Sequence, residues 1–158
     1  MSEPLSFDVC GIQKCMLNRH PWMYLDAAPE VIPMEKALCV KNFTYNEWFF
    51  PPHFDDDPNV PGFIQIECCL QAFLMTFLSS EKYSGLETAD HTIDNAKLQR
   101  KIVPGDTLEI RAYLESFNRG VAKGRVESFV DGQGACSFDV VVAVVVELDR
   151  YKPRRESD

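Results

Sequence analysis

One stretch of this 158-residue chain, residues 49–71, places a histidine and a carboxylate where they could transfer protons. His53 follows two prolines and precedes three aspartates, so its imidazole should lie on a stiff, polar loop. Glu67 follows in a long apolar segment. A neutral imidazole can accept a proton near neutral pH, and a carboxylic acid removed from water can donate one. These two residue types therefore predict acid–base chemistry.

Glu67 has a structural and a functional interpretation. A carboxylate in an apolar helix is costly unless it is paired or protonated, so it could form a salt bridge to a distant Lys or Arg. We favour the functional interpretation, a general acid whose pKa is raised by burial. Gln71 follows Glu67 by one helical turn, so the two side chains share a face and can hydrogen-bond. Gln71 is then either a polar filler of the core or a residue that orients the acid.

The helix that carries Glu67 should begin at Pro61 and Gly62 and run to residue 79 or 80. It is apolar on nearly every face, which predicts that it is buried on all sides. The loop before it, residues 46–60, is long for a compact domain, and such loops are usually functional.

The rest of the chain should wrap this helix. Before it, Ser6 could cap a short helix over residues 8–17, and strands are expected over 22–31 and 36–45. After it, four strands rich in β-branched and aromatic residues are expected over 92–102, 107–117, 121–130 and 135–148. Turn sequences between these four predict an antiparallel meander.

A long helix enclosed by a curled antiparallel sheet is an α+β hotdog arrangement. It should occupy residues 1–150 as one domain, since 158 residues are enough for one ordinary core. The polar residues 151–158 should form a disordered tail.

Charge and composition bound the function further. Residues 1–90 hold 5 basic and 13 acidic side chains, whereas residues 91–158 hold 11 of each, and the acidic half argues against a nucleic-acid partner. The start of the chain lacks the basic region and apolar run of a secretory signal. The longest aliphatic run, 140–146, is too short to span a bilayer as a helix. A cytoplasmic protein that does not insert into membranes is expected.

The cysteines show neither a C-x-x-C pair nor the spacing of zinc ligands. We expect free, buried, reduced thiols and no metal site. They are Cys10, Cys15, Cys39, Cys68, Cys69 and Cys136.

Three blocks in the right order resemble the β-hydroxyacyl-acyl carrier protein dehydratases of the FabZ type. The family's loop motif is matched, with its spacing intact, by His53-Phe54, Pro58, Pro61-Gly62 and Glu67. The strand before the loop is matched by residues 41–50, the strand after the helix by 93–106, and an early block more loosely by 19–26. Departures at Pro52, aspartates 55–57 and Gln65 leave the catalytic pair unchanged and suggest a specialised pathway member.

The resemblance implies a hotdog dimer, with larger assemblies of dimers common, whose active sites lie at the dimer interface, His from one subunit facing the acid of the other. It also implies a cytoplasmic enzyme without metal or redox cofactor, whose substrate is carried on the phosphopantetheine arm of acyl carrier protein. His53 would then take the C2 proton and Glu67 would protonate the departing 3-hydroxyl. The backbone N–H of Gly62, at a helix N-terminus, would bind the thioester carbonyl as it gains charge.

The expected reaction is the reversible dehydration of a 3-hydroxyacyl-acyl carrier protein to the trans-2-enoyl thioester, in fatty acid or polyketide-type biosynthesis. The alternative is a hotdog acyl thioesterase, which also uses an acid on the central helix but does not require the loop histidine. A non-catalytic acyl-binding or scaffold subunit is a third class, and the presence of both His53 and Glu67 argues against it.

A basic cluster could receive the acidic carrier protein. Lys97, Arg100 and Lys101 follow the apolar helix, and Lys123 comes later. Strand alternation predicts Lys97 and Lys101 on one face and Arg100 on the other. The cluster is either a solvated strand face or a docking site for the carrier.

Overall fold

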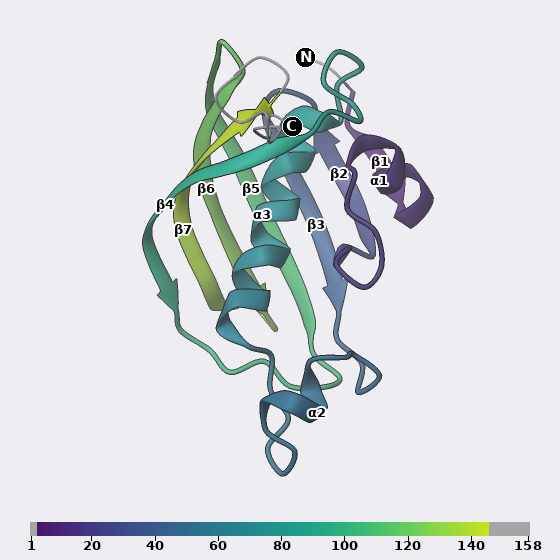
Figure 1. Ribbon diagram of the computed structural model, residues 1–158, viewed down its shortest axis with the longest axis vertical. Coiled ribbons are helices and arrows are strands. Elements are labelled where there is room, and N and C mark those ends of the chain that lie inside the picture. Colours follow the sequence, from purple (N-terminus) through teal and green to yellow (C-terminus); the bar gives the residue numbers. More distant parts are fainter. Residues whose placement is uncertain (1–2, 146–158) are drawn as a thin grey trace, which may run out of the picture.

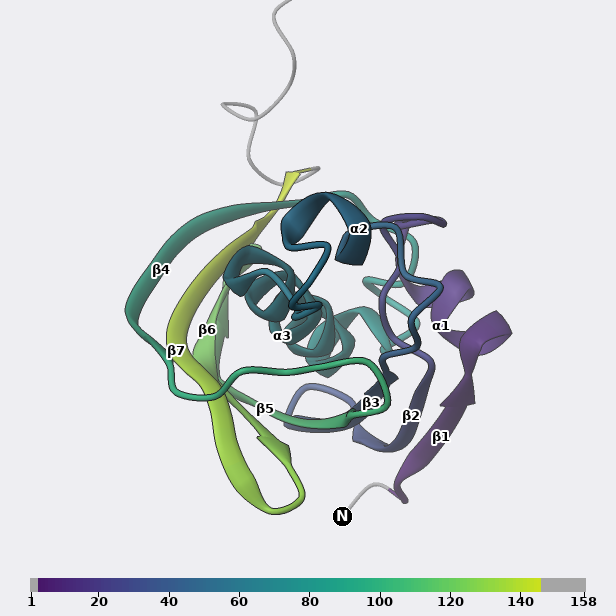
Figure 2. The same ribbon diagram turned by 90° about the horizontal axis from the view of Figure 1, so that it is seen from below.

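The computed structural model describes residues 3–145, in which one curved sheet surrounds a long helix (Figure 1). The helix is α3, Gly62–Leu78. The sheet has seven antiparallel strands in the order β1-β2-β3-β5-β6-β7-β4. Their bounds are β1 Leu5–Asp8, β2 Ala27–Ile32, β3 Lys36–Asn42, β4 Thr88–Leu98, β5 Thr107–Asn118, β6 Val121–Val130 and β7 Gln133–Val144. Viewed along α3, the strands curl around the helix, and the predicted α+β hotdog fold is confirmed (Figure 2).

Strands β5, β6 and β7 form the expected meander, but β4 does not belong to it. β4 pairs with β7 at the edge of the sheet, whereas β5 pairs with β3, with Lys36 opposite Tyr113. The predicted first connection of the meander is therefore wrong. The turn at residues 103–106 is present, but its Gly105 N–H donates to the carbonyl of Phe43. Turn residues bend the chain locally, and they do not decide which strand becomes the neighbour.

The N-terminal region also differs from the prediction. A strand, β1, occupies Leu5–Asp8, and the short helix α1 spans Val9–Cys15. Its N-cap is Asp8, whose carboxylate accepts from the Gly11 N–H, so Ser6 is not the cap. Residues 22–26 are not part of a strand. The Trp22 carbonyl and the Tyr24 N–H bind the Gln71 side chain, whereas the Asp26 N–H reaches β3, at the carbonyl of Val40.

α3 packs one side against the concave face of the sheet. Phe73 lies over Gly124 of β6, where an added Cβ would come within 2.0 Å of the Tyr113 carbonyl oxygen and 2.6 Å of the Phe73 ring. Glycine therefore allows the helix to approach the sheet closely. The prediction that α3 is buried on all sides is wrong, because Phe63 is 85% exposed and Ile66 and Glu67 are half-buried.

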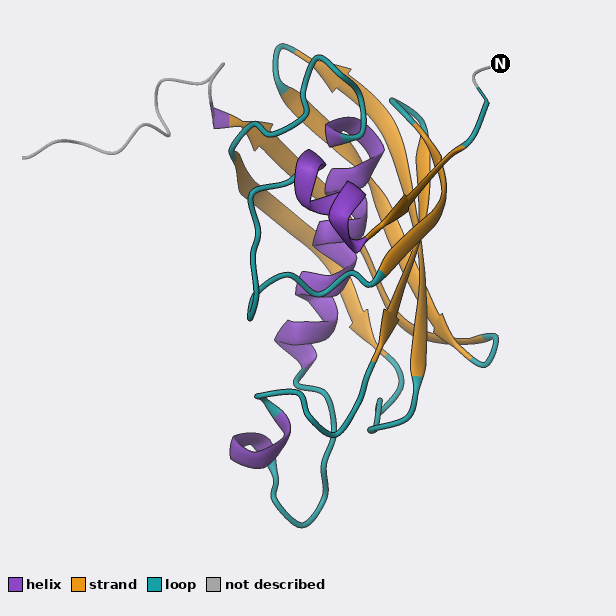
Figure 3. Cartoon of the chain, turned by 90° about the vertical axis from the view of Figure 1, so that its right-hand side faces the viewer, coloured by secondary structure: helices purple, strands orange, loops and turns teal. Residues whose placement is uncertain are grey.

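The loop before α3 is not entirely irregular. It contains the one-turn helix α2, Phe50–His53, which lies beyond the N-terminal end of α3 (Figure 3). None of the helices in residues 3–145 has the length and apolar content that a membrane-spanning helix needs. The cysteines are free, and they are buried except for Cys10, which is exposed against the prediction. The predicted tail and residues 146–148 of the predicted last strand lie outside the described residues.

Candidate active site

Glu67 lines a pocket of about 400 Å³ beside α3. Leu70, Leu74 and Leu78 continue the same stripe of the helix and form an apolar wall. The remaining lining residues come from the segments around α1, the turn after it and β4, namely Met16, Leu17, Asn18, Trp22, Leu86, Glu87, Thr88 and Asp90. The pocket therefore combines an apolar wall on α3 with polar groups, among them the carboxylates of Glu67, Glu87 and Asp90.

Gln71 holds Glu67 in place. Its Nε2 donates to the Glu67 Oε1 at 2.8 Å and to the carbonyl of Trp22 at 2.6 Å, while its Oε1 accepts from the Tyr24 N–H at 2.8 Å. Gln71 is fully buried, and all three bonds are made inside the protein. The hydrogen bond expected from the helical spacing is present. Within residues 3–145 Glu67 forms no salt bridge, so the structural alternative is not supported there.

The environment of Glu67 favours its protonated form. Burial raises the pKa of this carboxyl above its ordinary value, and the nearby Asp90 carboxylate acts in the same direction. Hydrogen bonds from Gln71 and Trp22 act in the opposite direction and are the weaker influence. A carboxyl group with these neighbours can serve as a proton donor at a higher pH than a solvated glutamate.

His53 is the last residue of α2 and is half-buried. Its Nδ1 lies 2.9 Å from the carbonyl oxygen of Asn59. Because a carbonyl oxygen can only accept, Nδ1 carries the proton and Nε2 remains as the basic nitrogen. The ring also contacts Phe54, with 4.4 Å between centroids. The loop thus fixes both the tautomer and the direction of the imidazole.

His53 does not line the pocket that contains Glu67. α2 lies beyond the start of α3 (Figure 3). The pocket is lined on α3 by residues from Glu67 to Leu78, toward the other end of the helix. A single chain therefore does not bring the predicted base and acid together in this pocket.

Gly62 is the first residue of α3, after Pro61. Its N–H belongs to the first turn of the helix, which has no intrahelical acceptor for such groups. A Cβ at this position would lie 2.6 Å from Cδ1 of Leu98, a half-exposed side chain on β4. Glycine at this position therefore allows the Leu98 side chain to pack against the start of α3. The binding of a substrate carbonyl by the Gly62 N–H stays a prediction.

The predicted basic cluster is dispersed. Only Lys97 belongs to β4, because Arg100 and Lys101 follow its end, so the predicted alternation of their faces is wrong. Lys101 forms an ion pair with Asp57 of the His53 loop, and Arg100 donates to the Gln133 side chain. Lys97 lies opposite Ser137, and Lys123 lies on β6 opposite Val141.

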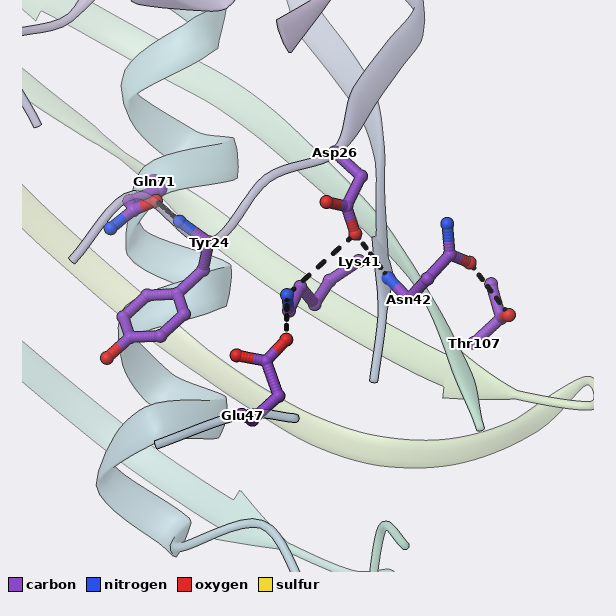
Figure 4. A network of polar contacts seen from close by, with 7 residues as sticks. All are labelled: Tyr24, Asp26, Lys41, Asn42, Glu47, Gln71 and Thr107. Carbon is purple, nitrogen blue, oxygen red and sulfur yellow. Dashed lines mark hydrogen bonds and ion pairs between the residues drawn. The ribbon is translucent and has the colours of Figure 1, made fainter. Parts of the chain in front are cut away.

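The sequence reasoning missed a polar network that joins β3 to the loop (Figure 4). Lys41, 6% exposed, contacts Glu47 at 2.5 Å and Asp26 at 3.9 Å. The burial of Lys41 could have been predicted from the alternation of side chains along the strand. Ala37 and Cys39 are buried, and Lys41 lies on the same face of β3.

Aromatic side chains connect the same segments. Trp22 lies 6.3 Å from Trp48, and Tyr24 lies 6.3 Å from Phe49, measured between ring centroids. The segment that Gln71 binds is therefore packed against the segment that leads into α2. Trp22 also lines the Glu67 pocket, a role that the sequence alone did not indicate.

Among the described residues 3–145, no group of three or more His, Cys, Asp or Glu side chains is arranged to hold a metal ion. The predicted absence of a metal site stays a prediction.

Residues 23–139 match the model of the FabA-like domain, and this chain belongs to that family. Its relatives include proteins named 3-hydroxyacyl-[acyl-carrier-protein] dehydratase FabZ. The one from Lactobacillus helveticus is 34% identical over 137 residues, covering 87% of this chain and 93% of the relative. The one from Chromobacterium violaceum is 35% identical over 147 residues, covering 90% and 97%. The predicted resemblance to FabZ-type dehydratases is confirmed.

Solved structures agree on the fold. The dehydratase heterocomplex ApeI:P from Xenorhabdus doucetiae matches with a TM-score of 0.76 at 15% identity, over 90% of this chain and 97% of that chain. The TT0310 protein from Thermus thermophilus matches with a TM-score of 0.59 at 19% identity, over 80% and 98%.

Proposed function

We propose that this chain catalyses the reversible dehydration of a 3-hydroxyacyl thioester on acyl carrier protein to the trans-2-enoyl thioester, as in fatty acid biosynthesis. The observation that carries the proposal is the half-buried Glu67, with its raised pKa, held by Gln71 in a pocket with a leucine wall on α3. The membership of the chain in the FabA-like family and its FabZ relatives support the same reaction.

The two proton transfers fall to different residues. The Nε2 of His53 removes a proton from C2 of the acyl chain, and the N–H of Gly62 stabilises the negative charge that develops on the thioester carbonyl oxygen. Glu67 then gives its proton to the 3-hydroxyl as the C3–O bond breaks, so water leaves and the C2–C3 double bond forms. Gln71 keeps the carboxyl group of Glu67 oriented toward the substrate.

The complete site is formed by two copies of the chain. This proposal is supported by the absence of His53 from the pocket of its own chain and by the exposed start of α3, where Phe63 is 85% exposed. In a homodimer, His53 of one copy would face Glu67 of the other. Larger assemblies of such dimers are compatible with this arrangement.

The substrate arrives on acyl carrier protein, and its phosphopantetheine arm is the only prosthetic group that the reaction requires. We place the enzyme in the cytoplasm. The proposed docking residues are Lys97, Arg100, Lys101 and Lys123. Lys101 forms an ion pair with Asp57, and Arg100 donates a hydrogen bond to Gln133. Lys97 and Lys123 are therefore the better candidates for binding the acidic carrier.

The experiment that tests the function mixes the purified protein with a trans-2-enoyl thioester on acyl carrier protein. Mass spectrometry of the carrier should show the gain of one water as the 3-hydroxyacyl thioester forms. Release of free carrier thiol would instead identify the thioesterase alternative. An unchanged thioester would identify a non-catalytic acyl-binding subunit.

A further inference from the structure

Lys41 is a charged side chain held in the interior between the two halves of the candidate site. It lies on β3 and is 6% exposed. Its Nζ contacts the Glu47 carboxylate at 2.5 Å and the Asp26 carboxylate at 3.9 Å, and it lies 5.5 Å from the centroid of the Phe43 ring. A buried ammonium is tolerated only with such partners, so its location is tightly determined.

The first partner, Glu47, stands at the entrance to α2. Its N–H donates to the carbonyl of Thr44, and its own carbonyl accepts from the N–H of Phe50, the first residue of α2. The Glu47 side chain is 18% exposed and points back to β3. The ion pair therefore fastens the beginning of the His53-bearing helix to a central strand of the sheet.

The second partner, Asp26, ends the segment that Gln71 binds. Its Oδ2 accepts from the Asn42 N–H at 2.6 Å, and its N–H donates to the carbonyl of Val40. Two residues earlier, the Tyr24 N–H donates to Gln71, which holds Glu67. Figure 4 shows Lys41 between the carboxylates of Asp26 and Glu47. Gln71, bonded to the Tyr24 backbone, lies beside these three residues in the same view.

We propose that Lys41 is a positioning residue, which through Glu47 and Asp26 holds the His53 loop and the Glu67-supporting segment in fixed relation to the same strand. Lys41 does not touch the substrate. The inference rests on the proposed dehydratase function, because its role is to align the acid and base of that reaction.

The direct test replaces the cation with an unbranched apolar side chain. Lys41→Met should lower kcat of dehydration by about tenfold to a hundredfold, the scale on which a displacement of reacting groups by about 1 Å acts, and should change KM much less. Hydrogen exchange of residues 43–60 should become faster than in the wild type. Lys41→Arg, which keeps the cation, should retain more of kcat than Lys41→Met.

Two control variants separate positioning from stability. Lys36→Met removes a lysine from the same strand that pairs with Glu30 at 2.8 Å on the surface, and it should leave kcat and loop exchange unchanged. Val126→Ala opens the core on β6, away from the loop. It should lower the Tm without lowering kcat at a temperature where the variant is folded.

The double variant Lys41→Met/Glu47→Gln removes both charges of the short contact. It should recover Tm relative to Lys41→Met, because no unpaired carboxylate remains at Glu47, while kcat stays low because the connection is still missing. If Lys41→Met has a reduced Tm but wild-type kcat and loop exchange, Lys41 serves stability alone and the inference is wrong. Absence of dehydration in the wild-type protein would instead overturn the proposed function.

Discussion

The side-chain amide of Gln71 donates to the Glu67 carboxylate across 2.8 Å while its oxygen accepts from the Tyr24 N–H. Only one orientation of the amide fits these partners, because the nitrogen also faces the carbonyl of Trp22. A rotated amide would set its oxygen against two acceptors. The direction of the Glu67 carboxyl group is therefore tied to the backbone of residues 22–24.

Replacing Gln71 with Leu should weaken both stability and turnover. The Tyr24 N–H and the Trp22 carbonyl would lose their partners, at about 1–3 kcal/mol for each buried group. The carboxyl group of Glu67 would lose its orientation, so kcat should fall more than KM rises. Chemical denaturation and steady-state kinetics measure the two effects. Thr76→Val, which removes a buried hydroxyl bonded within the same helix to Phe73, should spare kcat if Gln71 acts through Glu67.

Glu67→Gln should give a folded, inactive protein with a distinct pH dependence of stability. Burial raises the pKa of Glu67, so the folded state binds this proton more tightly than the unfolded state, whose ordinary value is 4.5. Wild-type stability should therefore decline as the pH rises from about 4.5 through the raised pKa. The variant lacks this decline, and its Tm relative to the wild type should increase over the same range. A variant that is strongly destabilised but still active would contradict the assignment.

His53→Ala should remove the base without disturbing the core. We expect kcat to fall by about a hundredfold or more, the usual effect of losing a positioned acid or base. Stability should change by no more than about 0.5 kcal/mol, because the ring is half-buried on a loop. His91→Ala on β4 provides the matched histidine control and should keep full activity. Near-normal turnover of His53→Ala would exclude this residue from the mechanism.

Mixing the inactive His53→Ala and Glu67→Gln proteins should restore part of the activity if two chains share each site. A mixed dimer then has one site with neither substitution and one site with both. Co-refolding at equal concentrations should yield about a quarter of wild-type activity if subunits pair at random, since half of the dimers are mixed. Native mass spectrometry must show that exchange has occurred. Exchange without any recovery would mean that both residues act within one chain.

Reversing the charge of Lys97 or Lys123 should weaken recognition of the carrier protein. The acidic carrier meets a chain with a net charge of −8, so binding depends on local cations. KM for carrier-bound substrate should rise, more at low salt, while KM for a small pantetheine thioester should hardly change. Lys14→Glu on α1 serves as the control for net charge. Equal losses with both substrates would show that these lysines support the fold or the chemistry instead.

Features that depend on a few neighbouring residues could be predicted from the sequence. The apolar run and its Pro61-Gly62 start placed α3 correctly, and the spacing of Glu67 and Gln71 placed both side chains on one face. Turn chemistry likewise predicted the β5-β6-β7 meander. These features follow from backbone periodicity and local turn preferences, which act over one or two turns of chain.

Only the tertiary structure decided the features that join distant segments. β4 follows α3 in sequence but pairs with β7, and Gln71 binds a backbone group 47 residues away. Lys101 forms an ion pair with Asp57 of the loop instead of lying on an exposed strand face. Lys41 is buried because Asp26 and Glu47 provide its partners in the interior. A polar side chain can be buried only where its partners converge, and that convergence depends on how the whole chain packs.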